Sequence, residues 1–180
     1  MSSVEPIRNI EDIKKIENFL LNKNKRDLLL FTIGTNCGLR ISDILALNVE
    51  DVKNKDFLQI TEKKTKKFKK IPINKKLKEL ISDYTKDKNN KDALFKTIFG
   101  NRLERVGAYY IIKTVCMKVG IQEKIGTHTL RKTFGYHHYK RNKDIAILQK
   151  IFNHSSMEIT LRYIGIEQEE IYQSYLEFVL

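Results

Sequence analysis

The sequence predicts a mainly α-helical α+β domain with one small antiparallel β-sheet. Prolines occur only at Pro6 and Pro72, so long helices are permitted over most of the 180 residues. Apolar residues recur at helical spacing in most segments, whereas residues 49–73 have the composition of two short strands joined by a lysine-rich connection. No repeat or linker divides the chain. We therefore expect one domain over residues 1–180, in which residues 167–180 form a helical tail.

The first half of the chain is expected to hold three helices and the sheet. The first helix is amphipathic, with these apolar residues at helical spacing: Ile10, Ile13, Ile16, Phe19 and Leu20. A second helix is expected over residues 26–36, ended by Gly38, and a short third over residues 42–47. Residues 57–60 and 68–73 have the composition of strands, and an antiparallel pair is expected there.

The second half is expected to be helical again. Further helices are predicted over residues 75–84 and 102–119 and from near Thr127 and Asp144. Ser155 is followed three residues later by Glu158, a capping-box pattern that predicts the start of one more short helix. The tail is amphipathic, with an apolar stripe made of Ile171, Tyr172, Tyr175, Leu176 and Val179.

The composition favours double-stranded DNA as the partner. Lys and Arg number 34 against 22 Asp and Glu, and a globular chain with a net charge of +12 most often binds a polyanion. An anionic membrane surface is the competing partner. No apolar run approaches the ~20 residues that cross a bilayer. The N-terminus does not have the layout of a signal peptide, so we expect a cytoplasmic protein.

Redox and metal chemistry are not indicated. Cys37 and Cys116 are isolated in apolar, helical contexts, which is the pattern of reduced core residues and not of a disulfide framework or a metal site. No other cluster of metal ligands stands out. We expect no metal and no cofactor.

Two arginines far apart in the sequence are suited to clamp one phosphate. Arg40 follows a Gly-Leu turn between helices, where a side chain can project into a cleft. Arg131 lies three residues after His128, so both occupy one helix face. Arginine binds two phosphate oxygens at once and stays charged, which suits a transition state that gains charge on those oxygens.

The same set contains a nucleophile and the groups to move its protons. Tyr163 has a phenol whose ordinary pKa of about 10 requires a base near neutrality, and His128 suits that role. His154 lies at the approach to the short helix that carries Tyr163 and can donate to a phosphate oxygen. Lys64 in the strand connection can protonate a departing sugar oxygen if neighbouring cations lower its pKa.

These residues fall in blocks that resemble a known family. G-L-R-I-S-D, K-T-K-K, H-T-L-R-K-T and H-S-S-x-x-I-T-x-x-Y occur in the order and spacing of the tyrosine recombinase catalytic domain, the phage integrase family, over about residues 5–170. The resemblance implies the fold of that domain and a site-specific DNA recombinase or integrase activity. It implies that Tyr163 attacks the scissile phosphate to give a 3′-phosphotyrosyl bond and a free 5′-hydroxyl.

The resemblance also assigns the remaining roles. Arg40 and Arg131 are implied to bind the scissile phosphate, and Lys64 to be the general acid. His128 is implied to assist proton transfer, and His154 is the second histidine of the family. Asp43, at the acidic position after the first arginine, is implied to support the site without reacting.

The sequence departs from the family in two glycines and in length. Lys66 stands where the family hairpin commonly has glycine, so Lys63 or Lys66 competes with Lys64 as the general acid. Asn153 replaces the glycine before His154, a change that asparagine tolerates because it adopts left-handed backbone angles. The separate N-terminal DNA-binding domain of most members has no counterpart, which indicates either a minimal recombinase or a partner that supplies it.

The remaining lysines are expected to contact DNA, and the chain to assemble on it. The candidates for phosphate contacts are Lys63, Lys66, Lys67, Lys69 and Lys132. We expect a homo-oligomer, a tetramer on DNA, in which the tail packs either on a neighbouring subunit or on its own domain. An accessory protein is a further possible partner. Two other functions stay open: a type IB topoisomerase, and a DNA-binding accessory module that no longer cuts.

Overall fold

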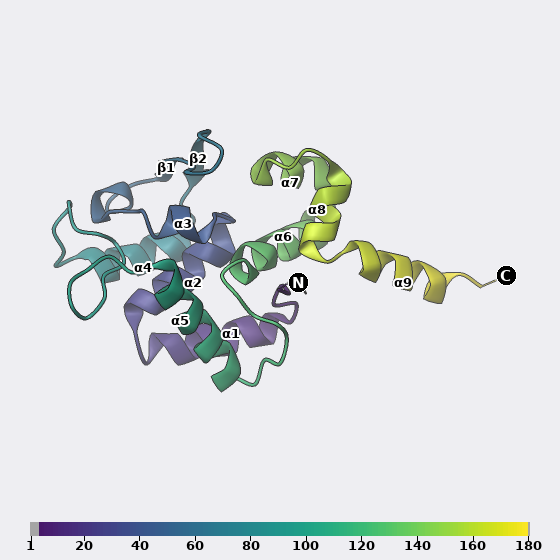
Figure 1. The fold of residues 1–180 in the computed structure, drawn as a ribbon, viewed down its shortest axis with the longest axis horizontal. Helices are drawn as coiled ribbons and strands as arrows, with labels where there is room; N and C mark the ends of the chain where they lie inside the picture. The colour runs from purple at the N-terminus through teal and green to yellow at the C-terminus, as the bar shows by residue number, and fades with distance from the viewer. Residues whose placement is uncertain (1–3, 180) are drawn as a thin grey trace.

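The fold is a helical domain with a single β-hairpin at one edge (Figure 1). The computed structural model describes residues 4–179, with the side chains at 167–170 and 174 left outside the description. Its elements are α1 (Ile10–Leu21), α2 (Lys25–Cys37), α3 (Ile41–Ile44), the 3₁₀ helix η1 (Val49–Asp51), β1 (Phe57–Thr61), β2 (Phe68–Pro72), α4 (Lys75–Thr85), α5 (Arg105–Lys118), α6 (Thr129–Asn142), α7 (Ile145–Phe152), α8 (Met157–Ile164) and α9 (Glu167–Glu177). The predicted fold class is confirmed.

Helix α2 is the centre of the main core. Its residues 28–34 are all buried, which explains why the segment lacks a polar stripe. Helices α1, α4 and α6 pack around it. The helix begins at Asn24, whose side chain accepts from the backbone N–H groups of Arg26 and Asp27, and ends at Gly38 in a left-handed conformation (φ 61°). This end places the next residues at the edge of the core.

The hairpin projects from the main core with little burial of its own. Strands β1 and β2 pair antiparallel from Phe57↔Pro72 to Thr61↔Phe68, and only Leu58 is buried. The connecting turn is closed by the backbone N–H of Glu62, which donates to the carbonyl of Lys67 at 3.0 Å. A hairpin with so little buried area depends on side-chain links for its position.

A second, smaller apolar cluster lies under α7 and α8. Its buried members are Tyr136, Leu148, Phe152, Ile164 and Ile166. Helix α6 joins the two clusters, since Leu130 near its start belongs to the main core and Tyr136 further along belongs to the smaller one. The segment that carries the proposed nucleophile therefore stands on a core separate from that of the hairpin and α2.

Three predicted details differ from the structure. Helix α5 begins at Arg105 and not at residue 102, because the Arg102 guanidinium is held by the carbonyls of Leu45 and Leu47 at 2.8 and 2.9 Å. The predicted short third helix ends at Ile44. The predicted capping box at Ser155 is also wrong, because the N-cap of α8 is Ser156.

Helix α8 is capped by the second serine of the pair. The Ser156 hydroxyl accepts from the backbone N–H of Ile159 at 3.2 Å. The preceding Asn153 is in the left-handed conformation (φ 55°), and the backbone N–H of His154 donates to the carbonyl of Gln149. This closure of α7 extends over the residues next to Ser155, and the following helix therefore begins one residue later than the pattern indicated.

The tail, α9, extends away from the body of the domain (Figure 1). It contacts α8, and the described apolar side chains of α9 and of the residues that follow it are exposed, including Tyr175 (80%) and Phe178 (69%). Of the two arrangements considered for the tail, packing on its own domain is not the one that this structure shows. In the described part of the chain, none of the helices is both long enough and apolar enough to span a membrane.

Candidate active site

The two predicted arginines come from distant parts of the sequence and lie in one region of the fold. Arg40 is the residue immediately before α3, and Arg131 lies in the first turn of α6. Arg131 is only 3% exposed; its guanidinium donates to the carbonyls of Gly38 and Phe152 and lies 4.3 Å from the centre of the Phe152 ring. Arg131 therefore fixes the loop of Arg40 against the end of α7.

A carboxylate that the sequence analysis did not single out joins this region to the hairpin. Glu62 is fully buried, and its Oε1 accepts from Nη1 of Arg40 at 2.7 Å and pairs with Nζ of Lys69 at 3.0 Å. Burial alone would raise the pKa of Glu62, but hydrogen bonds from Thr65 and Lys69, with the charges of Lys69 and Arg40, hold it below its usual value. In the sequence, the only sign of a special role for Glu62 was that it is an acidic residue next to a lysine-dense run.

The hairpin lysines divide into exposed and engaged groups. Lys64 is exposed at the turn, and within residues 4–179 the structure gives its Nζ no hydrogen bond or ion pair. Lys67 donates to Oδ1 of Asn153, and Lys69 donates to the carbonyl of Ile151 at 2.5 Å. Burial, reinforced by Arg131 and Arg40 against the opposing effect of Glu62, lowers the pKa of Lys69.

The turn keeps the backbone that glycine would give it. Lys66 has φ 57°, a left-handed angle, and its N–H donates to the carbonyl of Glu62 at 2.9 Å. The backbone N–H of Lys63 donates to Oδ1 of Asp43, a buried carboxylate, at 2.9 Å. Asp43 thus supports the hairpin turn through a backbone hydrogen bond, and lysine occupies the left-handed position without opening the bond between Lys66 and Glu62.

The proposed nucleophile and base face each other across α6 and α8. The Tyr163 hydroxyl lies 3.4 Å from Nδ1 of His128. The Tyr163 ring contacts Phe152 and His154 edge-on, and Nζ of Lys132 lies 5.2 Å from its centre. Lys132 is buried, so it packs against the tyrosine instead of forming part of an exposed basic face.

The pKa values of this pair favour a neutral phenol and a neutral imidazole near pH 7. Burial raises the pKa of Tyr163, and the charges of Arg131 and Arg40 oppose the rise only in part. Partial burial lowers the pKa of His128, with the cations Arg105 and Arg131 acting in the same direction. A neutral imidazole can accept a proton, so His128 is in the form that a general base needs. The two shifts also widen the pKa gap between the phenol and the imidazole, so the transfer needs the phenolate oxygen to bond to phosphorus as the proton leaves.

His154 is held by the next turn of α8. Its Nδ1 lies 3.1 Å from the Thr160 hydroxyl, which also lies within donating distance of the carbonyl of Ser156. Burial, with the charges of Arg131, Arg40 and Lys69, lowers the pKa of His154 to about 4. A neutral His154 can donate a hydrogen bond from Nε2 only in the tautomer in which Nδ1 accepts a hydrogen bond from the Thr160 hydroxyl.

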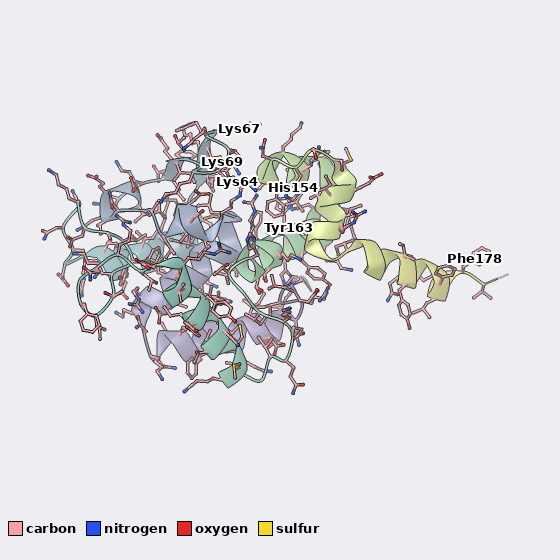
Figure 2. The ribbon with its side chains drawn as sticks, viewed as in Figure 1. Lys64, Lys67, Lys69, His154, Tyr163 and Phe178 are labelled. Atoms are coloured by element: carbon pink, nitrogen blue, oxygen red, sulfur yellow. The ribbon has the colours of Figure 1, made fainter. Side chains whose placement is uncertain are left out.

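The predicted site residues Arg40, His128, Arg131, His154 and Tyr163 thus come together, and among the described residues Lys64 is not joined to them by a hydrogen bond or an ion pair. Figure 2 shows Lys64, Lys67 and Lys69 on the hairpin and places His154 and Tyr163 on the side of α7 and α8. Among the described residues, no group of three or more His, Cys, Asp or Glu side chains forms a metal-binding cluster. Cys37 and Cys116 are buried and free, and burial raises the pKa of each to about 12.

Comparison with known proteins gives the family. Residues 9–170 match the family model described as the phage integrase family. The chain belongs to this family. A relative named "Probable integrase/recombinase YoeC", from Bacillus subtilis, is 52% identical over 99% of this chain and 98% of its own length. A tyrosine recombinase of Pseudothermotoga lettingae is 32% identical over 93% of this chain, which spans 63% of that protein.

Solved structures agree on the fold of the phage integrase domain. The crystal structure of XerA recombinase superposes with a TM-score of 0.77 at 20% identity, covering 98% of this chain and 65% of that one. XerH site-specific recombinase bound to palindromic difH substrate gives 0.72 at 18% identity, covering 96% and 53%. The predicted recombinase catalytic-domain fold is therefore confirmed, and the relatives are recombinases, which favours that function over the topoisomerase alternative.

Proposed function

We propose that this chain is a site-specific DNA recombinase that cleaves and rejoins strands through a 3′-phosphotyrosyl intermediate. The observation that carries the proposal is the Tyr163 hydroxyl 3.4 Å from His128, beside two arginines from distant parts of the chain. Membership of the phage integrase family supports the same activity. A DNA substrate also implies action where DNA is accessible, and we propose the cytoplasm.

Each residue then has a role in a balanced transfer. The Tyr163 oxygen forms a bond to phosphorus as its proton passes to His128, and the bond from phosphorus to the 5′ oxygen breaks. Arg40 and Arg131 stabilise the charge on the non-bridging oxygens, and His154 donates to one of them. Rejoining is the reverse reaction, in which a 5′-hydroxyl displaces the tyrosine.

Lys64 is the proposed general acid for the departing 5′ oxygen. Its ammonium is exposed on the turn and, in the part of the chain described here, is not committed to another side chain, so DNA can recruit it. Lys63 and Lys66 stay as alternatives because they lie in the same turn. Lys67 and Lys69 already bind the α7–α8 side. We propose that Lys63 and Lys66, which are exposed, contact phosphates near the turn.

The assembly on DNA is part of the proposal. We propose that residues 1–180 act as one catalytic domain, and that a tetramer on DNA, with or without an accessory protein, completes the grip on the duplex. The exposed apolar side chains of α9 support packing of the tail on a neighbouring subunit. Each apolar side chain fully covered in such an interface contributes about 1.5–3 kcal/mol.

A covalent-trapping experiment tests the activity. Nicked suicide duplexes of randomised sequence are incubated with the protein, and covalent adducts are isolated under denaturing conditions and sequenced. The wild-type protein should yield adducts on a related set of sequences, and Tyr163→Phe, which removes only the hydroxyl, should yield none. Adducts at equal yield from the Phe variant would assign the nucleophile elsewhere.

A matched pair of substitutions tests the tail. Phe178→Ser on the tail should weaken cooperative assembly on the selected duplex, measured by the mass of complexes in solution. Phe99→Ser removes an equally apolar ring that is 83% exposed outside the tail and should leave assembly unchanged. Equal effects of the two variants, or none from Phe178→Ser, would rule out docking of the tail on a neighbour.

A further inference from the structure

Glu62 links parts of the proposed site that have separate chemical tasks. Its Oε1 lies between Arg40 and Lys69, and its Oε2 accepts from the Thr65 hydroxyl at 2.5 Å. Thr65 follows Lys64 directly in the hairpin turn. A single buried carboxylate therefore touches the guanidinium proposed to bind the phosphate and the turn that presents the proposed general acid.

We propose that Glu62 is a positioning residue, which holds Arg40 and the turn of Lys64 in one fixed relation so that phosphate binding and leaving-group protonation occur together. This inference rests on the proposed recombinase function. Glu62 itself does not reach the reacting atoms in this role, because both of its oxygens are occupied by protein groups. It acts through Arg40 on one side and through Thr65 on the other.

Burial and charge make this arrangement hard to replace. The carboxylate is completely enclosed, and a buried ion pair that loses one partner leaves an uncompensated charge. Without Glu62, the cations Arg40, Lys69 and Arg131 would repel one another in a poorly solvated region. The bond to Glu62 uses Nη1 of Arg40, and in residues 4–179 the structure gives no protein partner to its Nε or Nη2. Those donors stay available for a phosphate.

The turn needs this link because its backbone is locally unfavourable. Lys66 is held at a left-handed φ of 57°, which an L-residue adopts only when other contacts impose it. The side-chain bond between Thr65 and Glu62 acts at the residue between Lys64 and Lys66. Its loss should let the turn, and with it the Lys64 ammonium, sample other positions while the strands remain paired.

The test uses two substrates and matched variants. One suicide duplex carries the ordinary 5′ bridging oxygen; the other carries sulfur there, a leaving group that needs no proton. Thr65→Val removes the link to the turn and keeps the side-chain shape, while Glu62→Gln removes the negative charge that pairs with Arg40. Thr61→Val is the control, since Thr61 is exposed at the strand end and, among the described residues, its hydroxyl has no hydrogen bond.

The expected pattern separates the two functions of Glu62. Thr65→Val should slow adduct formation about tenfold or more on the oxygen duplex, within the range of general-acid effects, and should recover nearly wild-type rates on the sulfur duplex. Glu62→Gln should stay slow on both, because the Arg40 contribution is not rescued by sulfur. Wild-type rates for Thr65→Val on oxygen, or equal losses on both duplexes, would overturn the coupling.

Amide hydrogen exchange tests the same inference without an activity measurement. Peptides covering residues 61–68 should exchange about tenfold faster in Thr65→Val and Glu62→Gln, as expected when a local hydrogen bond is lost, while α2 stays protected in both. Unchanged exchange would overturn the inference on its own. A wild-type protein that forms no adduct with any duplex would refute the proposed function instead, and the exchange result would still decide whether Glu62 holds the turn.

Discussion

Removal of the Phe152 ring should unfold the α7–α8 segment without unfolding the main core. Phe152 is fully buried in the smaller cluster and lies against the Arg131 guanidinium and the Tyr163 ring. A Phe→Ala change in a core typically costs about 3–5 kcal/mol. The five buried side chains of this cluster contribute on the order of 10 kcal/mol before conformational entropy is subtracted. The free energy lost with the ring is therefore a large part of the stability of the α7–α8 segment.

Hydrogen exchange measures whether the loss stays local. Phe152→Ala should lower the protection of amides in α7 and α8 by 100-fold or more, since each 1.4 kcal/mol is about a factor of ten, with α2 retaining its protection. Covalent trapping should be lost in parallel because Tyr163 is on α8. Phe95→Ala, an equally buried ring in the main cluster, is the control and should weaken protection in α2. Uniform loss in both helices from Phe152→Ala would show that the two clusters unfold as one unit, which contradicts the reasoning.

Two more changes follow from the local chemistry of the site. The pKa of His154 is about 4 in the folded protein and about 6.5 in the unfolded chain, so the unfolded chain takes up the proton first as the pH falls. The melting temperature should therefore decline between about pH 6.5 and 4. His154→Asn should flatten that decline in the same melting curves. Lys66→Gly should raise stability by up to about 1 kcal/mol, because the left-handed conformation costs an L-residue about 1–2 kcal/mol and glycine returns part of that as chain entropy. A melting temperature that rises as much for Lys66→Ala, which keeps the strained backbone, would assign the gain to lost charge.

Local patterns were enough to predict most elements. Apolar spacing located α1 to within a residue, and Gly38 was predicted and found as the end of α2. Such features depend on interactions within a few residues of each other, which the sequence displays directly. The start of α5 failed for the opposite reason. Arg102 is held by carbonyls more than fifty positions earlier in the chain, and no helical pattern records that contact.

The two positions at which this chain lacks a family glycine show what local sequence can predict about backbone conformation. Asn153 and Lys66 both adopt left-handed angles, φ 55° and 57°, so the backbone at each position has the form that glycine favours. The tolerance of asparagine was predictable from its side chain. That lysine retains the same form depends on contacts around the turn. The Lys66 N–H donates to the carbonyl of Glu62 within the turn, and the Lys63 N–H donates to Asp43, about twenty positions earlier in the chain.

The same separation explains why the sequence blocks were visible and their connections were not. Each block was recognised by residue types at short spacing, whereas the structure joins the blocks through single polar contacts between them. Arg131 binds carbonyls before Arg40 and at the end of α7, and Lys67 crosses from the hairpin to Asn153. Glu62 belongs to these connections and not to a block. A carboxylate among lysines would ordinarily be interpreted as a solvated surface charge, and its complete burial beside Arg40 shows that the hairpin and Arg40 form one unit.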